Sequence, residues 1–356
     1  MSIPAPPLKS HKGRGGISNL PGRFSSRHVE SDEPQPDAAP DTVLRPMQAR
    51  TIISHNQSPD IPFDHSINPY HGCEHGCIYC YARPSHSYLD LSPGLDFETQ
   101  IFYKPNAVTQ LLAAWEKPSY VCEPITIGAN TDPYQPAEKQ LGITRKLLET
   151  FLKHRHPVSL ITKGGLMFRD LDLLARLAER NLVSVAVSVP TMDADLKRIL
   201  EPRIPSAAVR FRLIRALADA GVPTSLLLAP IIPAVNDPEI ESIIERAAAS
   251  GARHAAWIFL RLPNELKTIF REWLHAHMPD RASHVISLIR QASGNRDYDN
   301  RFGIRQRGRG PYATMIDTRF KAACRRYGIG SSRYSAILDR TAFVPPGQQQ
   351  MTLGFD

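Results

Sequence analysis

The amino-acid sequence predicts an α/β protein whose main part is a partial (β/α)6 barrel. From about residue 60 to 265, short β-rich runs alternate with helical patterns, which is the form of repeated βα units and a parallel sheet. The stretch before is rich in Pro, Gly, Ser and mixed charge, and the stretch after turns to helix-like patterns alone. The 356 residues therefore divide into a disordered arm (1–45), a barrel (46–265) and a helical C-terminal extension (266–356).

The barrel is predicted from its strands and from the segments between them. The candidate strands are the runs SINPY, PITIGAN, PVSLITK, LVSVAVSVP, PTSLLLAPI and HAAWIFLR. Intervening segments such as AEKQLGITRKLLETFLKH and LDLLARLAERN repeat apolar residues at three- and four-residue spacing, as outer helices do. In such barrels catalytic residues gather at the C-terminal ends of the strands, so the loops after the strands are expected to hold the site.

The arm offers few large apolar residues, so burial cannot offset the entropy of folding it, and we expect it to be disordered. A solvated tail is one interpretation. Contact with nucleic acid is the other, and it would use the basic residues Lys9, Lys12, Arg14, Arg23 and Arg27.

Composition narrows the class of protein. Lys and Arg number 43 against 35 Asp and Glu, a formal net charge of +8, which mildly favours an anionic partner such as nucleic acid. Neither a signal peptide nor a membrane-spanning stretch is evident, so no membrane partner is expected. Five cysteines, three of them between positions 73 and 80, suit metal ligands better than disulfides and predict a reducing, cytoplasmic location.

The most informative segment is NPYHGCEHGCIYCYARP, which places Cys73, Cys77 and Cys80 in a C-x3-C-x2-C pattern directly after the first strand. Thiolates are the ligands that iron–sulfur clusters require, and this spacing lets one loop surround a compact cluster. Gly72 and Gly76 suit the positive φ angles that a crowded loop needs. Three protein ligands leave one iron open for another ligand.

This spacing, with Tyr79 before the third cysteine, resembles the signature of radical S-adenosylmethionine (radical SAM) enzymes. The resemblance implies a [4Fe-4S] cluster on the three cysteines, with S-adenosyl-L-methionine chelated by the open iron through its amino and carboxylate groups. An electron donor, not identifiable from the sequence, would reduce the cluster. Reductive cleavage of the cofactor would then give a 5′-deoxyadenosyl radical that abstracts hydrogen from a substrate.

Two alternatives remain open at this stage. His71 and His75 with the cysteines suit a closed zinc site, although such sites rarely end the first strand of a long βα array. The chain could instead be an iron–sulfur binding or electron-transfer protein without radical chemistry, which would need no cofactor pocket. Cys122 and Cys324 are distant in sequence and are expected to be buried small hydrophobes.

Residues 55–265 look most similar to the branch of the superfamily that contains spore photoproduct lyase. The segments ANTDPYQPAEK, ITKGG and SVPTMDADLKRILEPRIPS follow successive strands, where a barrel places its chemistry. The resemblance implies a set of cofactor contacts: Tyr79, Asn130, Thr131, Lys163, Ser188 and Arg203.

Several of these positions also have purely structural interpretations. Arg203 could form a local ion pair with Glu201 in the EPR run, and Asp132 before Pro133 could organise a turn and a helix entry. Arg261, after the sixth strand, is a weaker candidate for a cofactor or substrate contact.

One departure from the photoproduct lyases matters. Those enzymes carry a cysteine within the segment that corresponds to ANTD, and it returns a hydrogen atom to the product radical; this chain has none there. DNA photoproduct repair by the same route is therefore in doubt, and a tyrosine would have to replace the thiol, the candidates being Tyr79, Tyr81 and Tyr134.

The C-terminal run NRDYDNRFGIRQRGRGPY combines five arginines with aromatic residues. Arginines contact phosphates and aromatic rings stack on bases, so the run fits single-stranded or flipped nucleic acid. The alternative is a basic loop that docks on acidic barrel helices. The substrate and the bond that is broken cannot be assigned from the sequence, and nucleic acid is the first substrate class to test.

Overall fold

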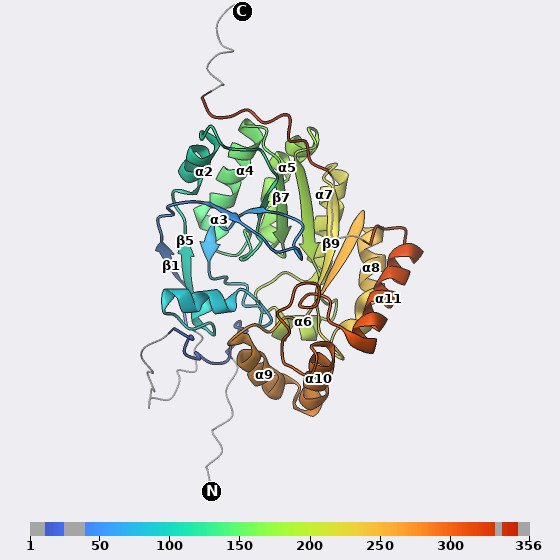
Figure 1. The fold of residues 1–356 in the computed structure, drawn as a ribbon. Helices are drawn as coiled ribbons and strands as arrows, with labels where there is room; N and C mark the ends of the chain where they lie inside the picture. The colour runs from blue at the N-terminus through green and yellow to red at the C-terminus, as the bar shows by residue number, and fades with distance from the viewer. Residues whose placement is uncertain (1–10, 25–39, 332–336, 348–356) are drawn as a thin grey trace, which may run out of the picture.

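The computed structural model describes residues 11–24, 40–331 and 337–347 (Figure 1). Its main sheet has seven strands in the order β10-β9-β8-β7-β6-β3-β2. Six run parallel, each paired with the next along the chain: β3 (His65–Ile67), β6 (Ile125–Ile127), β7 (Val158–Thr162), β8 (Val183–Ser188), β9 (Thr224–Ile231) and β10 (His254–Phe259). The antiparallel β2 (Ile53–His55) extends the sheet beyond β3. The predicted sixfold βα array is confirmed, as a barrel whose two edge strands, among the described residues, do not pair.

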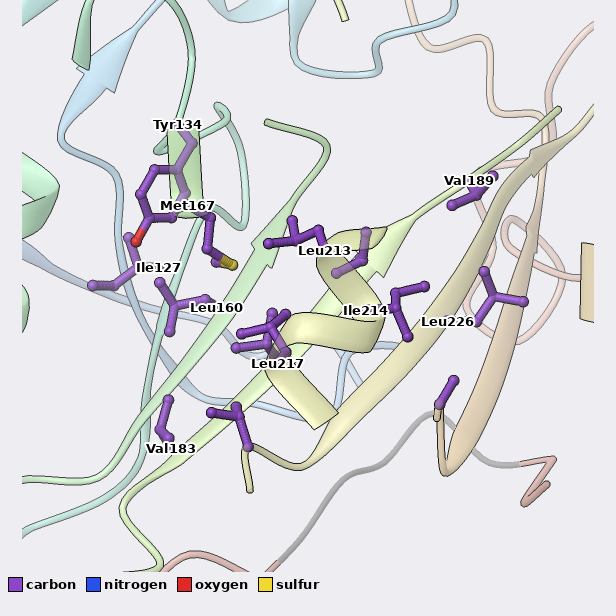
Figure 2. Close-up of a cluster of buried hydrophobic side chains, with 14 of the residues drawn as sticks. Ile127, Tyr134, Leu160, Met167, Val183, Val189, Leu213, Ile214, Leu217 and Leu226 are labelled. Atoms are coloured by element: carbon purple, nitrogen blue, oxygen red, sulfur yellow. The ribbon is translucent and has the colours of Figure 1, made fainter. Parts of the chain in front are cut away.

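Amphipathic helices cover the outside of this sheet, as the apolar spacing predicts: α2 (Ala107–Trp115), α3 (Glu138–Leu141), α4 (Ile143–Lys153), α5 (Leu171–Ala178), α7 (Ala207–Asp219) and α8 (Ile240–Ala249). In Figure 2, Leu213, Ile214 and Leu217 of α7 lie among side chains of the neighbouring strands. These three leucine and isoleucine side chains are wholly buried, and each such burial stabilises the fold by about 1.5–3 kcal/mol.

A second, three-stranded sheet stands next to the first, in the order β1-β5-β4. Its strands are β1 (Val43–Pro46), β4 (Tyr70–His71) and β5 (Gln100–Tyr103). The loop with the three cysteines leaves β4 and continues into the 3-10 helix η1 (Arg83–Leu89) and the short helix α1 (Asp96–Thr99), and β5 then returns to pair with β4. The cysteine loop is thus tied at both ends to one small sheet.

The chain beyond residue 265 is helical, as predicted, with α9 (Leu266–His277), α10 (Pro279–Ala292) and α11 (Gly310–Arg326). Figure 1 shows α11 beside α8, and the Arg319 guanidinium on α11 pairs with the Glu241 carboxylate on α8 at 2.7 Å. The helix α6 (Ala194–Leu200) is joined to α9, because the Trp273 indole donates a hydrogen bond to the Ile199 carbonyl at 3.1 Å. No helix in the described ranges is long and apolar enough to cross a membrane.

The N-terminal segment departs from the expected disorder wherever the structure describes it. Residues 11–24 pack against the cysteine loop, and Arg14 is 6% exposed, with its guanidinium donating to the Glu98 carbonyl at 3.0 Å and to the Pro40 carbonyl at 2.7 Å. Polar contacts and one buried apolar side chain, Ile17, hold this segment, so a count of apolar residues did not reveal it. Arg14 is thus not available to nucleic acid, whereas Lys9 and Arg27 lie outside the described residues.

Candidate functional site

A cavity of about 790 Å³ occupies the interior of the barrel. At one end it is lined by the three cysteines, and at the other by Ile337, Leu338 and Arg340 from the C-terminal segment. Between these ends the strands contribute small hydroxyl side chains, namely Ser66, Thr126, Ser159, Ser184 and Ser225. The cysteine loop therefore opens onto a space of the size that binds small molecules and cofactors.

The cysteine loop has the backbone that its glycines predict. Gly72 and Gly76 adopt φ angles of +79° and +66°, which favour glycine. Cys73 and Cys77 are 7% and 8% exposed, Cys80 is half-buried, and all three are free thiols. Burial raises the pKa of each thiol, so an iron cluster would have to displace their protons as it binds.

A wholly buried ion pair, Arg83 with Glu98, supports the backbone of the cysteine loop. Arg83 and Glu98 are both fully buried and in contact, and Arg83 also donates to the Cys77 carbonyl at 2.9 Å and to the Gly94 carbonyl at 2.8 Å. The Glu98 carboxylate accepts hydrogen bonds from the backbone N–H groups of Gly15 and Gly16, at 3.0 and 2.7 Å. One carboxylate thus joins the N-terminal segment, η1 and the cysteine loop.

Gly15 lies so close to the cysteine loop that no larger residue fits. A Cβ atom there would stand 1.8 Å from the Gly76 carbonyl oxygen. The GRGG run at positions 13–16 therefore packs directly against the backbone of the cysteine loop.

A second buried network lies on the other side of the loop. The Tyr79 hydroxyl donates to the Glu201 carboxylate, which pairs with the Arg210 guanidinium at 2.8 Å. Arg210 donates in turn to the Ser188 carbonyl at 3.0 Å. Glu201 and Arg210 are wholly buried, so this network fixes the Tyr79 ring on the cavity wall through β8 and α7.

Asp132 joins the cysteine loop to the end of β7. Its carboxylate accepts hydrogen bonds from the Thr162 hydroxyl and the Lys163 backbone N–H, both at 2.7 Å, and lies 3.4 Å from His75 Nδ1. Burial opposes ionisation of this carboxylate, but His75 and the hydrogen bonds outweigh burial and lower its pKa to about 2. The turn expected at Asp132 is present, since Asp132 also accepts from the Tyr134 N–H at 2.9 Å, and the same carboxylate positions Lys163.

Lys163 places a cation beside the cysteine loop. Its ammonium lies 5.9 Å from the centroid of the Tyr79 ring and on the cavity wall. Burial lowers the pKa of Lys163, but Cys77 and Glu201 raise it by more, so its pKa ends above its ordinary value. Lys163 therefore offers a permanent positive charge beside the cysteine loop.

Three of the six predicted cofactor contacts line the cavity: Tyr79, Asn130 and Lys163. The other three residues are turned to other partners. The Thr131 hydroxyl donates to the Tyr70 carbonyl at 2.9 Å, and the buried Ser188 hydroxyl donates to the Ala229 carbonyl at 3.1 Å. Arg203 pairs with Glu74 at 3.2 Å and donates to the Gly13 carbonyl, so its expected local pair with Glu201 is not formed.

The sequence missed the two buried ion pairs. Arg83 lies three residues after Cys80 in the quoted motif, so its position could have indicated a role beside the cysteine loop. Nothing in the local sequence indicates that Glu98 or Arg210 is buried in an ion pair. Of the remaining cysteines, Cys324 is wholly buried in the apolar core, as expected, and Cys122 is half-buried.

The tyrosines considered as hydrogen donors are placed differently from one another. Tyr134 is buried outside the cavity lining, and the Tyr79 hydroxyl is engaged by Glu201. The Tyr81 hydroxyl donates to the Ala129 carbonyl, in the segment where the photoproduct lyases carry their thiol, and its ring lines the cavity.

The arginines of the C-terminal run pair largely within the protein. Arg305 binds the Asp60 carboxylate at 2.6 Å, Arg301 binds Asp299 at 2.6 Å, and Arg307 lies 4.6 Å above the Trp257 ring. Such pairs favour a loop docked on the barrel over a row of free phosphate-binding side chains.

The zinc interpretation requires four donors gathered around one ion. His75, which such a site would use, lies with its Nδ1 3.4 Å from the Asp132 carboxylate instead. Three thiols along one loop that opens onto a cavity are the donor set of an iron–sulfur cluster with an open position.

Comparison with known proteins gives a family match and several relatives. The model of the Radical SAM superfamily matches residues 67–247, just over half of the chain. An uncharacterised protein of Mycobacterium tuberculosis is 36% identical over 233 residues, which cover 65% of this chain and 68% of the relative. An uncharacterised protein of Methanocaldococcus jannaschii is 28% identical over 173 residues, 49% of this chain and 62% of the relative.

Among solved structures, a mutant of spore photoproduct lyase superposes with a TM-score of 0.61 at 16% identity and covers 87% of both chains. Spore photoproduct lyase in complex with a dinucleoside spore photoproduct gives a TM-score of 0.58 at 16% identity, over 81% of this chain and 80% of that one. At such identity the likeness shows the fold alone. Fold, cysteine loop and family match together establish that the chain belongs to the radical SAM superfamily.

Proposed function

We propose that this protein is an enzyme that binds a [4Fe-4S] cluster on Cys73, Cys77 and Cys80 and uses S-adenosyl-L-methionine to generate a 5′-deoxyadenosyl radical. The observation that carries the proposal is that one cavity is lined both by the three thiols and by polar groups at the ends of β6 and β7. An iron–sulfur protein that only transfers electrons would need the thiols but no such cavity.

The chain's own residues supply binding, orientation and exclusion of water. The three thiolates would hold the cluster, the Lys163 ammonium would bind the cofactor's carboxylate, and Asn130 would offer a polar contact beside it. Asp132 and the network of Tyr79, Glu201 and Arg210 hold these groups in place.

Nucleic acid is the substrate class we propose to test first. The fold shared with spore photoproduct lyase and the net charge of +8 support it. Two observations limit it: the ANTD segment has no thiol, and the C-terminal arginines Arg301 and Arg305 are engaged by carboxylates. A nucleic-acid substrate would therefore require a hydrogen donor other than the lyases' cysteine.

The decisive experiment is anaerobic incubation of the reconstituted protein with S-adenosylmethionine and dithionite, followed by mass spectrometry for 5′-deoxyadenosine. We expect 5′-deoxyadenosine from the native protein and none from Cys77→Ala. A protein that contains its full cluster yet neither binds nor cleaves the cofactor would instead be an electron-transfer protein.

A further inference from the structure

One cation on the cavity wall has no acidic partner among the residues that the structure describes. Three side chains with permanent positive charge line the cavity: Lys163, Arg261 and Arg340. Arg340 pairs with Glu123 at 2.6 Å, and Lys163 is assigned above to the cofactor. Arg261 forms no ion pair with any acidic side chain in residues 11–24, 40–331 and 337–347, so its charge is left for a bound molecule.

Two neutral groups hold the Arg261 guanidinium in place. Its central carbon lies 5.0 Å from the centroid of the Tyr81 ring, and Nη2 donates to the Tyr298 hydroxyl at 3.3 Å. Its Nε is buried and finds no acceptor within the described structure. The side chain is therefore oriented, while its charge and one of its donors remain unused.

Gln306 presents a second unsatisfied group on the same cavity. The residue is 4% exposed, and its side-chain Oε1 is buried without a donor among the described residues. Its backbone is fixed, because the Gln306 carbonyl accepts from the Phe259 N–H at 2.8 Å and the preceding Arg305 is held by Asp60. A buried amide oxygen without a partner costs free energy that a donor on a ligand would recover.

We propose that Arg261 and Gln306 form the substrate-recognition site of the cavity, with Arg261 binding an oxyanion, a phosphate or a carboxylate, and Gln306 a neutral hydrogen-bonding group of the same molecule. The inference rests on the proposed function and names the chemical class of its substrate. The planar guanidinium matches either oxyanion through paired hydrogen bonds, and its partly buried position strengthens that attraction.

The test uses the reconstituted holoprotein with S-adenosylmethionine bound and no reductant, so binding is measured without turnover. Isothermal titration compares two pairs of probes that differ in one charge-bearing group: thymidine 5′-monophosphate against thymidine, and phenylacetate against phenylacetamide. The native protein should prefer the charged member of at least one pair by about ten- to a hundredfold, as expected for a charge-assisted hydrogen bond. The pair that shows the preference distinguishes phosphate from carboxylate.

Variants locate the effect. Arg261→Gln should abolish the preference and Arg261→Lys should keep part of it, whereas Arg301→Gln should leave it intact, because Arg301 is exposed and pairs with Asp299. Gln306→Leu should weaken binding of thymidine 5′-monophosphate and thymidine equally, because the two share the same neutral donor groups. Iron content is measured in each variant, so that a loss of the fold is recognised.

The proposal is overturned if no pair is discriminated, if the preference survives in Arg261→Gln, or if it disappears in Arg301→Gln. It is also overturned if Arg261→Gln weakens S-adenosylmethionine binding as much as Lys163→Ala does, because Arg261 would then belong to the cofactor. Formation of 5′-deoxyadenosine is assayed separately with dithionite, so failure of the proposed function is distinguished from failure of this site.

Discussion

Replacing Glu98 by Gln tests whether the buried pair beneath the cysteine loop holds the loop in shape. The change keeps the size of the side chain and removes its charge. Arg83 would remain wholly buried, with only carbonyl oxygens, such as those of Cys77 and Gly94, as partners. The two carboxylate oxygens of Glu98 accept from the Gly15 and Gly16 N–H groups, and the substitution would replace one of these oxygens by an amide NH2 group, which donates.

The expected cost follows from burial. Removing one partner of a buried ion pair costs about 3–5 kcal/mol, because the other charge is left uncompensated. Glu241→Gln is the matched control, since Glu241 pairs with the half-buried Arg319 near the protein surface, and such pairs contribute about 0–1 kcal/mol. The two substitutions are the same in chemistry and differ in environment.

Urea unfolding of the apoprotein measures the free energy of unfolding, and transfer of iron to a chelator measures how firmly the reconstituted cluster is held. Glu98→Gln should lower the free energy of unfolding and speed up the transfer of iron to the chelator. Glu241→Gln should change neither the free energy of unfolding nor the rate of iron transfer by much. If Glu98→Gln unfolds within about 1 kcal/mol of the native protein and releases iron at the native rate, the pair does not support the loop.

Three further predictions concern other parts of the molecule. Replacing Cys73, Cys77 or Cys80 by Ala should abolish cluster assembly, measured as iron and sulfide content, whereas Cys324→Ala should not. Binding of stoichiometric zinc with no iron would contradict this prediction. Lys163→Ala should keep the cluster and weaken S-adenosylmethionine binding about ten- to a hundredfold by titration, and unchanged affinity would make Lys163 structural. Burial lowers the pKa of His156 from 6.5 to about 3, so the unfolded chain binds a proton there below pH 6.5 that the folded chain does not, and His156 alone should lower the free energy of unfolding by about 2 kcal/mol from pH 7 to pH 5. His156→Gln should reduce the pH dependence by that amount, while other histidines whose pKa burial lowers, such as His71, keep the rest, and the exposed His275→Gln should leave the dependence unchanged; equal pH profiles for His156→Gln and the native protein in urea unfolding would refute the assignment.

The sequence predicted those features that depend on local pattern. The spacing of apolar residues and the residues at turns were enough to predict the six strands and their outer helices, because each βα unit must bury one apolar face. The spacing of the cysteines and the positions of Gly72 and Gly76 were enough for the loop, whose φ angles agree with the prediction.

Contacts between segments that are distant in the sequence could not be predicted from local pattern. Ser188 stands at the end of a strand, as a cofactor contact would, but its hydroxyl turns to the Ala229 carbonyl of the neighbouring strand. Glu201 stands two residues from Arg203 and pairs with Arg210, because α7 brings that guanidinium back to the loop. Spacing along the chain gave no basis for choosing between the two arginines.

The size of the cavity bears on the substrate. Under the proposed function, the cofactor and the reacting part of the substrate would share about 790 Å³, a space typical of small-molecule sites. A nucleic-acid duplex does not fit such a space, so a nucleic-acid substrate would have to insert a single nucleotide, at the cost of unstacking it. Arg261 would meet that nucleotide's phosphate, or the carboxylate of a small substrate that enters whole. If thymidine 5′-monophosphate binds through Arg261 and a short single strand binds no more weakly, the inserted nucleotide is supported; if the single strand is excluded while the monophosphate binds, the substrate is a small anion.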